Sequence, residues 1–242
     1  MLLNALREQV LEANLELNRR GLVLYTFGNV SGISREDGLV VIKPSGVPYE
    51  RMTPSDMVVT DLDGSIVEGT LRASSDLPTH LELYKAFPDI GGVAHTHSEF
   101  ATVWAQARKP IPCFGTTHAD YFFGSIPVTD DLSPDEIVED YEKNTGLVIR
   151  RCFHGQDPGD VPAVLVAGHG PFSWGESAMG ATRNAVILEF VARIAFHTVD
   201  LRADADPIPS ELLNKHFRRK HGPDAYYGQP AGGDSSGQNS GH

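Results

Sequence analysis

The stretch Gly91-Gly92-Val93-Ala94-His95-Thr96-His97 is the one around which the rest of the chain is organised. It is a short apolar run that ends in two histidines two positions apart. Side chains alternate between the faces of an extended backbone, so we expect His95 and His97 to point the same way. Two neutral imidazoles on one face can share a divalent metal ion, although strand histidines with a purely structural role show the same spacing.

Two further residues complete a possible ligand set. Asp76 lies in Ser74-Ser75-Asp76, and His169 lies between two glycines, directly after the apolar run Ala163-Val164-Leu165-Val166-Ala167. Glycines allow the backbone to turn at that point. Three imidazoles and one carboxylate form an N3O donor set that suits Zn²⁺, with Mn²⁺ or Co²⁺ as alternatives. The predicted ligands of one zinc ion per subunit are Asp76, His95, His97 and His169.

Composition narrows the class of protein. The chain has 242 residues and a formal net charge of −12, which predicts one domain and argues against nucleic acid or an anionic membrane as a partner. Two cysteines, Cys113 and Cys152, give no disulfide framework and are typical of a reducing compartment. The N-terminal segment lacks the apolar core of a signal peptide, and no apolar run approaches the ~18 residues of a membrane span. We therefore expect a cytoplasmic protein.

The pattern of apolar residues predicts alternating helices and short strands. Expected helices cover residues 3–20, 77–87, 98–107, 176–199 and 209–220, and another begins at Ser133, where a capping box starts. Expected strands cover residues 22–30, 39–42, 57–60, 91–97 and 163–167. This order predicts an α/β fold in which helices are layered on a mixed, largely antiparallel sheet. Residues 230–242 are rich in Gly, Ser and Asn, so we expect a disordered tail after a domain over 1–229.

Small polar residues occur in three predicted turns. They are Gly28-Asn29, Ser45-Gly46 and Ser74-Ser75, and Lys43 lies close to the second. Backbone N–H groups, hydroxyls and an amide in such turns can surround a phosphate, and Lys43 would supply positive charge. Each pair alone is also typical of an ordinary turn. Glycine-rich nucleotide motifs are absent from the sequence, so nucleotide binding is not predicted.

Five motifs in a fixed order carry a family resemblance. They are Gly28-Asn29-Val30-Ser31, Lys43-Pro44-Ser45-Gly46, Ser74 to His80, His95-Thr96-His97 and Gly115 to Tyr121, followed by Ala225-Tyr226-Tyr227-Gly228-Gln229. From about Leu3 to Gln229 the chain resembles the class II sugar-phosphate aldolases and epimerases, most closely the L-ribulose-5-phosphate 4-epimerases. The resemblance implies an α/β/α domain and a homotetramer with active sites at its subunit interfaces. It also implies that the three small polar pairs are the substrate-phosphate loops.

The resemblance further implies which residues carry protons. Asp120 and Tyr227 match the family's catalytic acid and base, which reach into the metal site of a neighbouring subunit. Thr116 and His216 resemble supporting residues of that pair. From the residues alone, Asp120 is as well explained as a helix cap, and Tyr227 as a packing tyrosine.

The reaction implied is reversible cleavage and re-formation of the C3–C4 bond, which interconverts L-ribulose 5-phosphate and D-xylulose 5-phosphate in the breakdown of arabinose and other pentoses. The metal ion would act as a Lewis acid. A rival within the family is an aldolase of the fuculose-phosphate type, but such aldolases usually carry Glu at the position of Asp76. A rival of another class is a non-catalytic interaction module of the same fold, which would lack the metal histidines.

Overall fold

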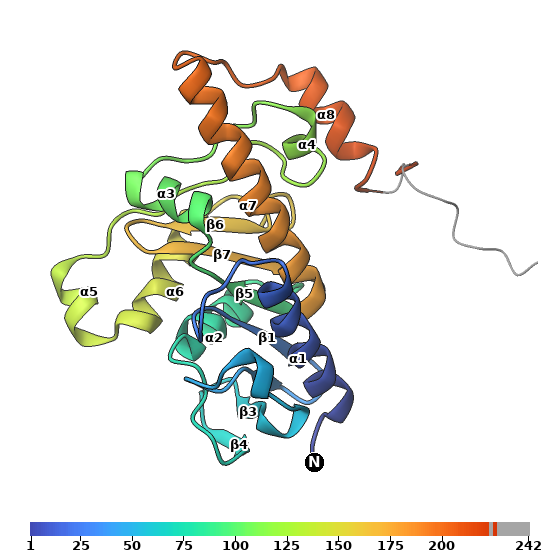
Figure 1. The fold of residues 1–242 in the computed structure, drawn as a ribbon, viewed down its shortest axis with the longest axis vertical. Coiled ribbons are helices and arrows are strands. Elements are labelled where there is room, and N and C mark those ends of the chain that lie inside the picture. Colours follow the sequence, from blue (N-terminus) through green and yellow to red (C-terminus); the bar gives the residue numbers. More distant parts are fainter. Residues whose placement is uncertain (223–224, 227–242) are drawn as a thin grey trace, which may run out of the picture.

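A computed structural model describes residues 1–222 and 225–226, in which one sheet is flanked by helices (Figure 1). The sheet has seven strands in the order β4-β3-β2-β1-β5-β7-β6. The strands are β1 (Asn29–Ser34), β2 (Leu39–Ile42), β3 (Val58–Asp61), β4 (Ile66–Glu68), β5 (Gly92–His95), β6 (Ala163–Val166) and β7 (Gly170–Gly175). All neighbouring strands pair antiparallel, and an isolated bridge from Val128 to Leu165 adds a parallel contact. The expected α/β fold with a largely antiparallel sheet is confirmed.

Helices cover both faces of the sheet. On one face, α1 (Asn4–Arg19) and the first turns of α7 (Ala178–Leu201) form a small core. On the other face, α2 (Leu77–Ala86) and α6 (Tyr141–Cys152) contribute to a larger core. The side chains of β5 alternate between the two, since Val93 belongs to the larger core and Ala94 to the smaller one. The other helices are η1 (Tyr49–Arg51), η2 (Pro54–Asp56), α3 (Glu99–Ala107), α4 (Thr116–Ala119), α5 (Pro134–Glu139) and α8 (Ser210–Arg218).

The helices predicted from strong local patterns are confirmed to within two residues at every end. They are α1, α2, α3, α7 and α8. The helix start at Ser133 is also confirmed, because its hydroxyl accepts from the Glu136 N–H and its own N–H donates to the Glu136 carboxylate. Helix α6 and strand β7 were not predicted. Gly146 interrupts the helical pattern of the first, and Gly and Pro open the second.

The strand predicted over residues 22–30 is wrong, because the strand begins only at Asn29. Gly28 has a φ of 72°, and a Cβ there would lie 2.6 Å from Val23 Cγ1 and 2.9 Å from the His95 oxygen. Only glycine fits this left-handed and crowded position, so the chain turns sharply before it enters the sheet. Residues 22–28 therefore form a loop that ends beside His95.

Glycine is required at residues 91 and 92 because the backbone at the start of α7 lies against them. A Cβ on Gly92 would lie 2.4 Å from the backbone nitrogen of Ala178, at the start of α7. We predict that Gly92→Ala lowers the free energy of unfolding by about 1–3 kcal/mol, because backbone cannot move aside as a side chain can. Chemical denaturation measures the change.

Gly115→Ala is the matched control for this prediction. Gly115 has extended backbone, and a Cβ there would meet no atom within 4 Å. The free energy of unfolding of the Gly115→Ala variant should stay the same or rise slightly, since alanine restricts the unfolded chain. Equal stabilities of the two variants would contradict the crowding at Gly92.

The structure describes the helices of the domain but not the end of the chain. The predicted tail over residues 230–242, and so the end of the predicted domain at 229, lies outside them. Among the helices in the described part of the chain, none has the length and apolar character to cross a bilayer.

Candidate metal centre

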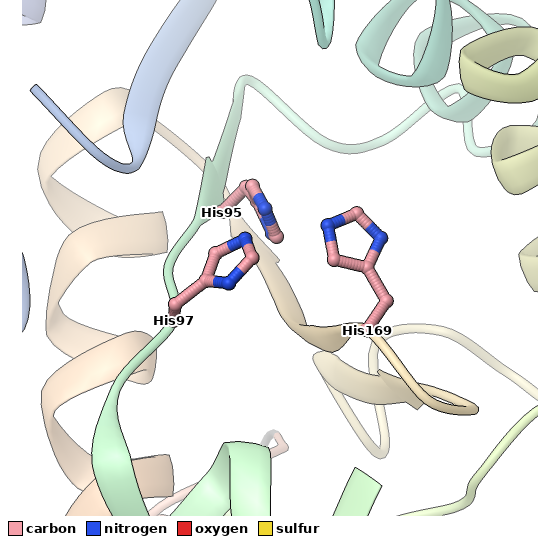
Figure 2. Close-up of side chains that lie close together, drawn as sticks. All are labelled: His95, His97 and His169. Atoms are coloured by element: carbon pink, nitrogen blue, oxygen red, sulfur yellow. The ribbon is translucent and has the colours of Figure 1, made fainter. Parts of the chain in front are cut away.

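Three imidazoles converge at one end of β5. His95 is the last residue of that strand, His97 follows it, and His169 lies in the turn between β6 and β7 (Figure 2). The ring centroids are 4.9 Å apart for His95 and His97, 4.8 Å for His95 and His169, and 5.0 Å for His97 and His169. One ligand nitrogen of each ring lies within 4.8 Å of the others. They meet because β5 pairs with β7, which places the turn before β7 beside the residues after His95.

The three imidazoles are neutral, which is the form that binds metals. His95 is 2% exposed, and its burial lowers its pKa. Burial also lowers the pKa of His97, and burial together with the other two imidazoles lowers that of His169 to about 3. The Nδ1–H of His95 donates to the Pro171 oxygen at 2.9 Å, which leaves Nε2 with its lone pair. Converging neutral nitrogens fit a divalent ion.

Asp76 lies beside the imidazoles, immediately before α2. Its Oδ2 accepts a hydrogen bond of 2.6 Å from the Asn29 amide. Burial raises the pKa of Asp76, but the positive charge that His95, His80 and His169 carry when protonated at acid pH, together with the hydrogen bond from the Asn29 amide, outweighs it and keeps the pKa below its usual value. The carboxylate is therefore ionised and available as an oxygen ligand, and its role as the fourth ligand remains a prediction.

One pocket of about 310 Å³ unites the predicted metal and phosphate residues. Its walls come from the loop before β1, the end of β2, the segment before α2 and the three histidines. Its lining residues are Thr26, Phe27, Gly28, Asn29, Lys43, Ser45, Gly46, Ser74, Ser75, Asp76, His95, His97 and His169. All the residues predicted to bind metal or substrate are in this set, together with Thr26 and Phe27. Their individual roles remain predictions.

Lys43 is the buried cation of this pocket. It is 2% exposed, and burial lowers its pKa to about 8, against the opposing effect of Asp76. Its ammonium lies 5.0 Å from the centre of the Tyr49 ring and donates to the Pro44 oxygen at 3.3 Å. The Tyr49 hydroxyl also contacts the Phe27 and Gly28 oxygens, at 2.8 and 3.0 Å. Tyr49 thus contacts both the lysine and the loop before β1. No pattern in the sequence predicts these contacts.

Comparison with known proteins decides the family. Residues 8–196 match the model of the class II aldolase and adducin N-terminal domain. The chain belongs to this family. Together with the imidazole cluster, membership indicates a metal-dependent enzyme that acts on a sugar phosphate.

Comparison with solved structures shows how far the likeness extends. An L-fuculose 1-phosphate aldolase is 25% identical with a TM-score of 0.76, and the match covers 89% of this chain and 95% of the aldolase. YgbL from Klebsiella pneumoniae is 24% identical with a TM-score of 0.71, covering 87% and 97%. The L-fuculose-1-phosphate aldolase from Thermus thermophilus is 23% identical with a TM-score of 0.65, covering 84% and 98%. The last two show that the fold is shared.

Asp120 lies elsewhere in this class II aldolase domain, where α4 packs on α8 (Figure 1). Its carboxylate accepts from Arg219 Nε at 2.9 Å, from His216 Nδ1 at 3.0 Å and from Lys220 Nζ at 3.3 Å. Burial raises its pKa, but the hydrogen bonds from Arg219 and His216 outweigh this and leave the pKa below its usual value.

The structure thus brings Asp120 and His216 together but does not place Asp120 in the lining of its own chain's metal pocket. Thr116 begins the same short helix, α4. Tyr227 lies outside the described residues. Arg219 and Lys220, two partners of Asp120, were missed from the sequence, because a cation on a terminal helix is usually solvated.

The pH dependence of anion binding tests Lys43. We predict that Lys43→Met weakens binding of a phosphate monoester by about 10–150-fold at pH 7, because a charge-assisted contact in a buried site is lost. A lysine with a pKa of about 8 is charged below that pH and neutral above it. Affinity of the unmodified protein should therefore fall between pH 7 and pH 9, where the monoester stays doubly ionised. Titration calorimetry of both proteins at both pH values measures this, and equal affinities at pH 7 would remove Lys43 from the site.

Proposed function

We propose that this protein is an L-ribulose-5-phosphate 4-epimerase, which interconverts L-ribulose 5-phosphate and D-xylulose 5-phosphate by breaking and re-forming the C3–C4 bond. The observation that supports it most is the shared pocket, which is lined by three neutral imidazoles, a carboxylate, a buried lysine and small polar turns. Its volume of about 310 Å³ suits a small ligand such as a five-carbon sugar phosphate.

The length of the acidic side chain favours the epimerase over the aldolase. Aldolases of the fuculose-phosphate type usually carry Glu here, which reaches the substrate as a base. In this chain Asp76 is shorter, and the Asn29 amide binds one of its oxygens. A short carboxylate beside three imidazoles is suited to hold a metal ion, and it reaches less far toward a substrate than Glu would.

The residues of the pocket would have two roles. A zinc ion held by Asp76, His95, His97 and His169 would supply Lewis-acid stabilisation of negative charge on oxygen. Lys43, with the backbone N–H groups and side chains of residues 28–29, 45–46 and 74–75, binds the phosphate and so fixes the sugar.

Proton transfer completes the proposal. Epimerisation at C4 needs the aldehyde fragment to be attacked on either face, so one proton carrier is needed on each side. We assign these places to Asp120 and Tyr227 of a neighbouring subunit, with Thr116 and His216 beside them. This assignment requires active sites between subunits, because Asp120 is absent from the lining of its own chain's pocket, and we propose that the assembly is a homotetramer.

The second candidate is an aldolase of the fuculose-phosphate type, which releases glycerone phosphate and an aldehyde. The L-fuculose 1-phosphate aldolase that shares 25% identity supports it. Such a reaction keeps the retro-aldol step but needs no attack on the opposite face. The pocket residues would have the same roles in an aldolase, so a measurement of substrate turnover has to distinguish the two functions.

The deciding experiment supplies both substrates to the zinc-loaded protein. An epimerase converts L-ribulose 5-phosphate to D-xylulose 5-phosphate, whereas the aldolase converts L-fuculose 1-phosphate to glycerone phosphate and an aldehyde. His97→Asn is the inactive control, and metal-free protein reloaded with Zn²⁺, Mn²⁺ or Co²⁺ identifies the effective ion. Turnover of L-fuculose 1-phosphate alone would replace the epimerase with the aldolase, and turnover of neither by metal-loaded protein would overturn both.

A further inference from the structure

Tyr141 contacts one of the three histidines from outside the pocket. Its hydroxyl lies 3.2 Å from His169 Nδ1, and the two ring centroids are 6.0 Å apart. Tyr141 is the first residue of α6, a helix that is absent from the pocket lining. No sequence pattern marks the contact, because the two residues are 28 positions apart.

The contact determines which nitrogen of His169 can bind a metal. Figure 2 shows one ring nitrogen of His169 turned toward His95 and His97 and the other turned away. Since Nδ1 contacts Tyr141, Nε2 is the nitrogen that faces the cluster. A neutral imidazole carries one proton, and placing it on Nδ1 as a donor to the tyrosine oxygen leaves the Nε2 lone pair for the ion. The Pro171 oxygen does the same for His95.

The position of Tyr141 is fixed by tight packing of α6 against α2. The Thr79 hydroxyl donates to the Glu142 oxygen at 2.5 Å. A Cβ on Gly146 would lie 2.6 Å from Glu82 Cβ and 3.1 Å from the Thr79 oxygen, so the two helices are in close contact. Because α2 begins directly after Asp76, the same helix pair supports both the carboxylate and the tyrosine.

We propose that Tyr141 is a positioning residue of the metal centre, whose hydroxyl oxygen accepts a hydrogen bond from the Nδ1–H of His169 and so holds Nε2 toward His95 and His97. The inference rests on the proposed metal site. Outer hydrogen-bond partners of this kind fix the tautomer and orientation of a ligating histidine, and their loss typically weakens metal binding 10–100-fold. Tyr141 is absent from the pocket lining, so we expect it to act only through His169.

Metal binding by Tyr141→Phe tests the proposal without an activity assay. Competition against a chelator should show Zn²⁺ affinity about 10–100-fold below that of the unmodified protein. Co²⁺ should bind with an altered visible absorption spectrum, since the geometry around the ion changes. The melting temperature of the metal-free protein should stay unchanged, because the variant keeps the ring and its packing. Tyr121→Phe, which removes a hydroxyl beside the α4–α8 contact, is the matched control and should bind both ions normally.

The possible outcomes separate the two hypotheses. Unchanged Zn²⁺ affinity and an unchanged Co²⁺ spectrum in Tyr141→Phe would overturn the positioning role. A lower melting temperature of the metal-free variant with normal metal affinity would also overturn it, because it would reveal a structural role. Failure of the unmodified protein to bind either ion would overturn the metal centre itself, and with it the proposed function.

Discussion

His97→Asn is expected to lose bound metal and to lower kcat by roughly 10³-fold or more, because a Lewis acid contributes several kcal/mol to the transition state. His97 is the most exposed of the three imidazoles, so its replacement should leave the fold intact. Asparagine also keeps a polar side chain of similar length while removing the imidazole nitrogen. Metal content measured by elemental analysis, together with the rate of L-ribulose 5-phosphate turnover, provides the test.

Two comparisons make the His97 result interpretable. His154→Asn changes an exposed histidine that does not line the pocket, and this variant should keep full metal content and activity. Treating the unmodified protein with a chelator should abolish activity, and adding Zn²⁺ should restore it. Full activity of metal-free protein would refute the role of the imidazole cluster, whatever the behaviour of the variants.

Mixed tetramers of Asp120→Asn and His97→Asn chains are expected to regain activity that neither variant has alone. Each active site in the proposed assembly combines the metal of one subunit with Asp120 of the next. With random mixing of equal amounts, about one quarter of the interfaces pair an intact metal site with an intact Asp120. We therefore expect recovery of up to about a quarter of the unmodified rate, measured after the two variants are unfolded and refolded together.

The environment of Asp120 sets the controls for this experiment. Within its own chain the carboxylate is bound by Arg219, His216 and Lys220, so Asp120→Asn removes the counter-charge of Arg219 and Lys220. Sizing of each refolded variant has to show the same assembly as the unmodified protein. Absence of recovery in confirmed tetramers would mean that each site is built from one chain. Normal activity of Asp120→Asn alone would remove this residue from proton transfer.

The sequence by itself determined features that depend on residues close together in the chain. The ends of α1 and α2, the capping box at Ser133 and the strand β2 follow from local periodicity and capping, and the structure agrees. The ordered motifs were sufficient to predict the family, which the match over residues 8–196 shows. The residues predicted to bind metal and phosphate line one pocket, and their roles stay predictions. The choice between epimerase and aldolase stays a prediction, because it depends on proton carriers that we predict to lie between subunits.

Only the tertiary structure decided features that arise from contacts between distant segments. Pairing of β5 with β7 places His169 beside His95. The strand β7 is hard to predict from the sequence, because it begins with Gly and Pro. Burial lowers the pKa of Lys43 to about 8, and burial depends on how the whole chain packs. The contact of Tyr141 with His169 likewise depends on the packing of α6 against α2. Local patterns specify which residue types are available, whereas strand pairing and helix packing specify which of them meet.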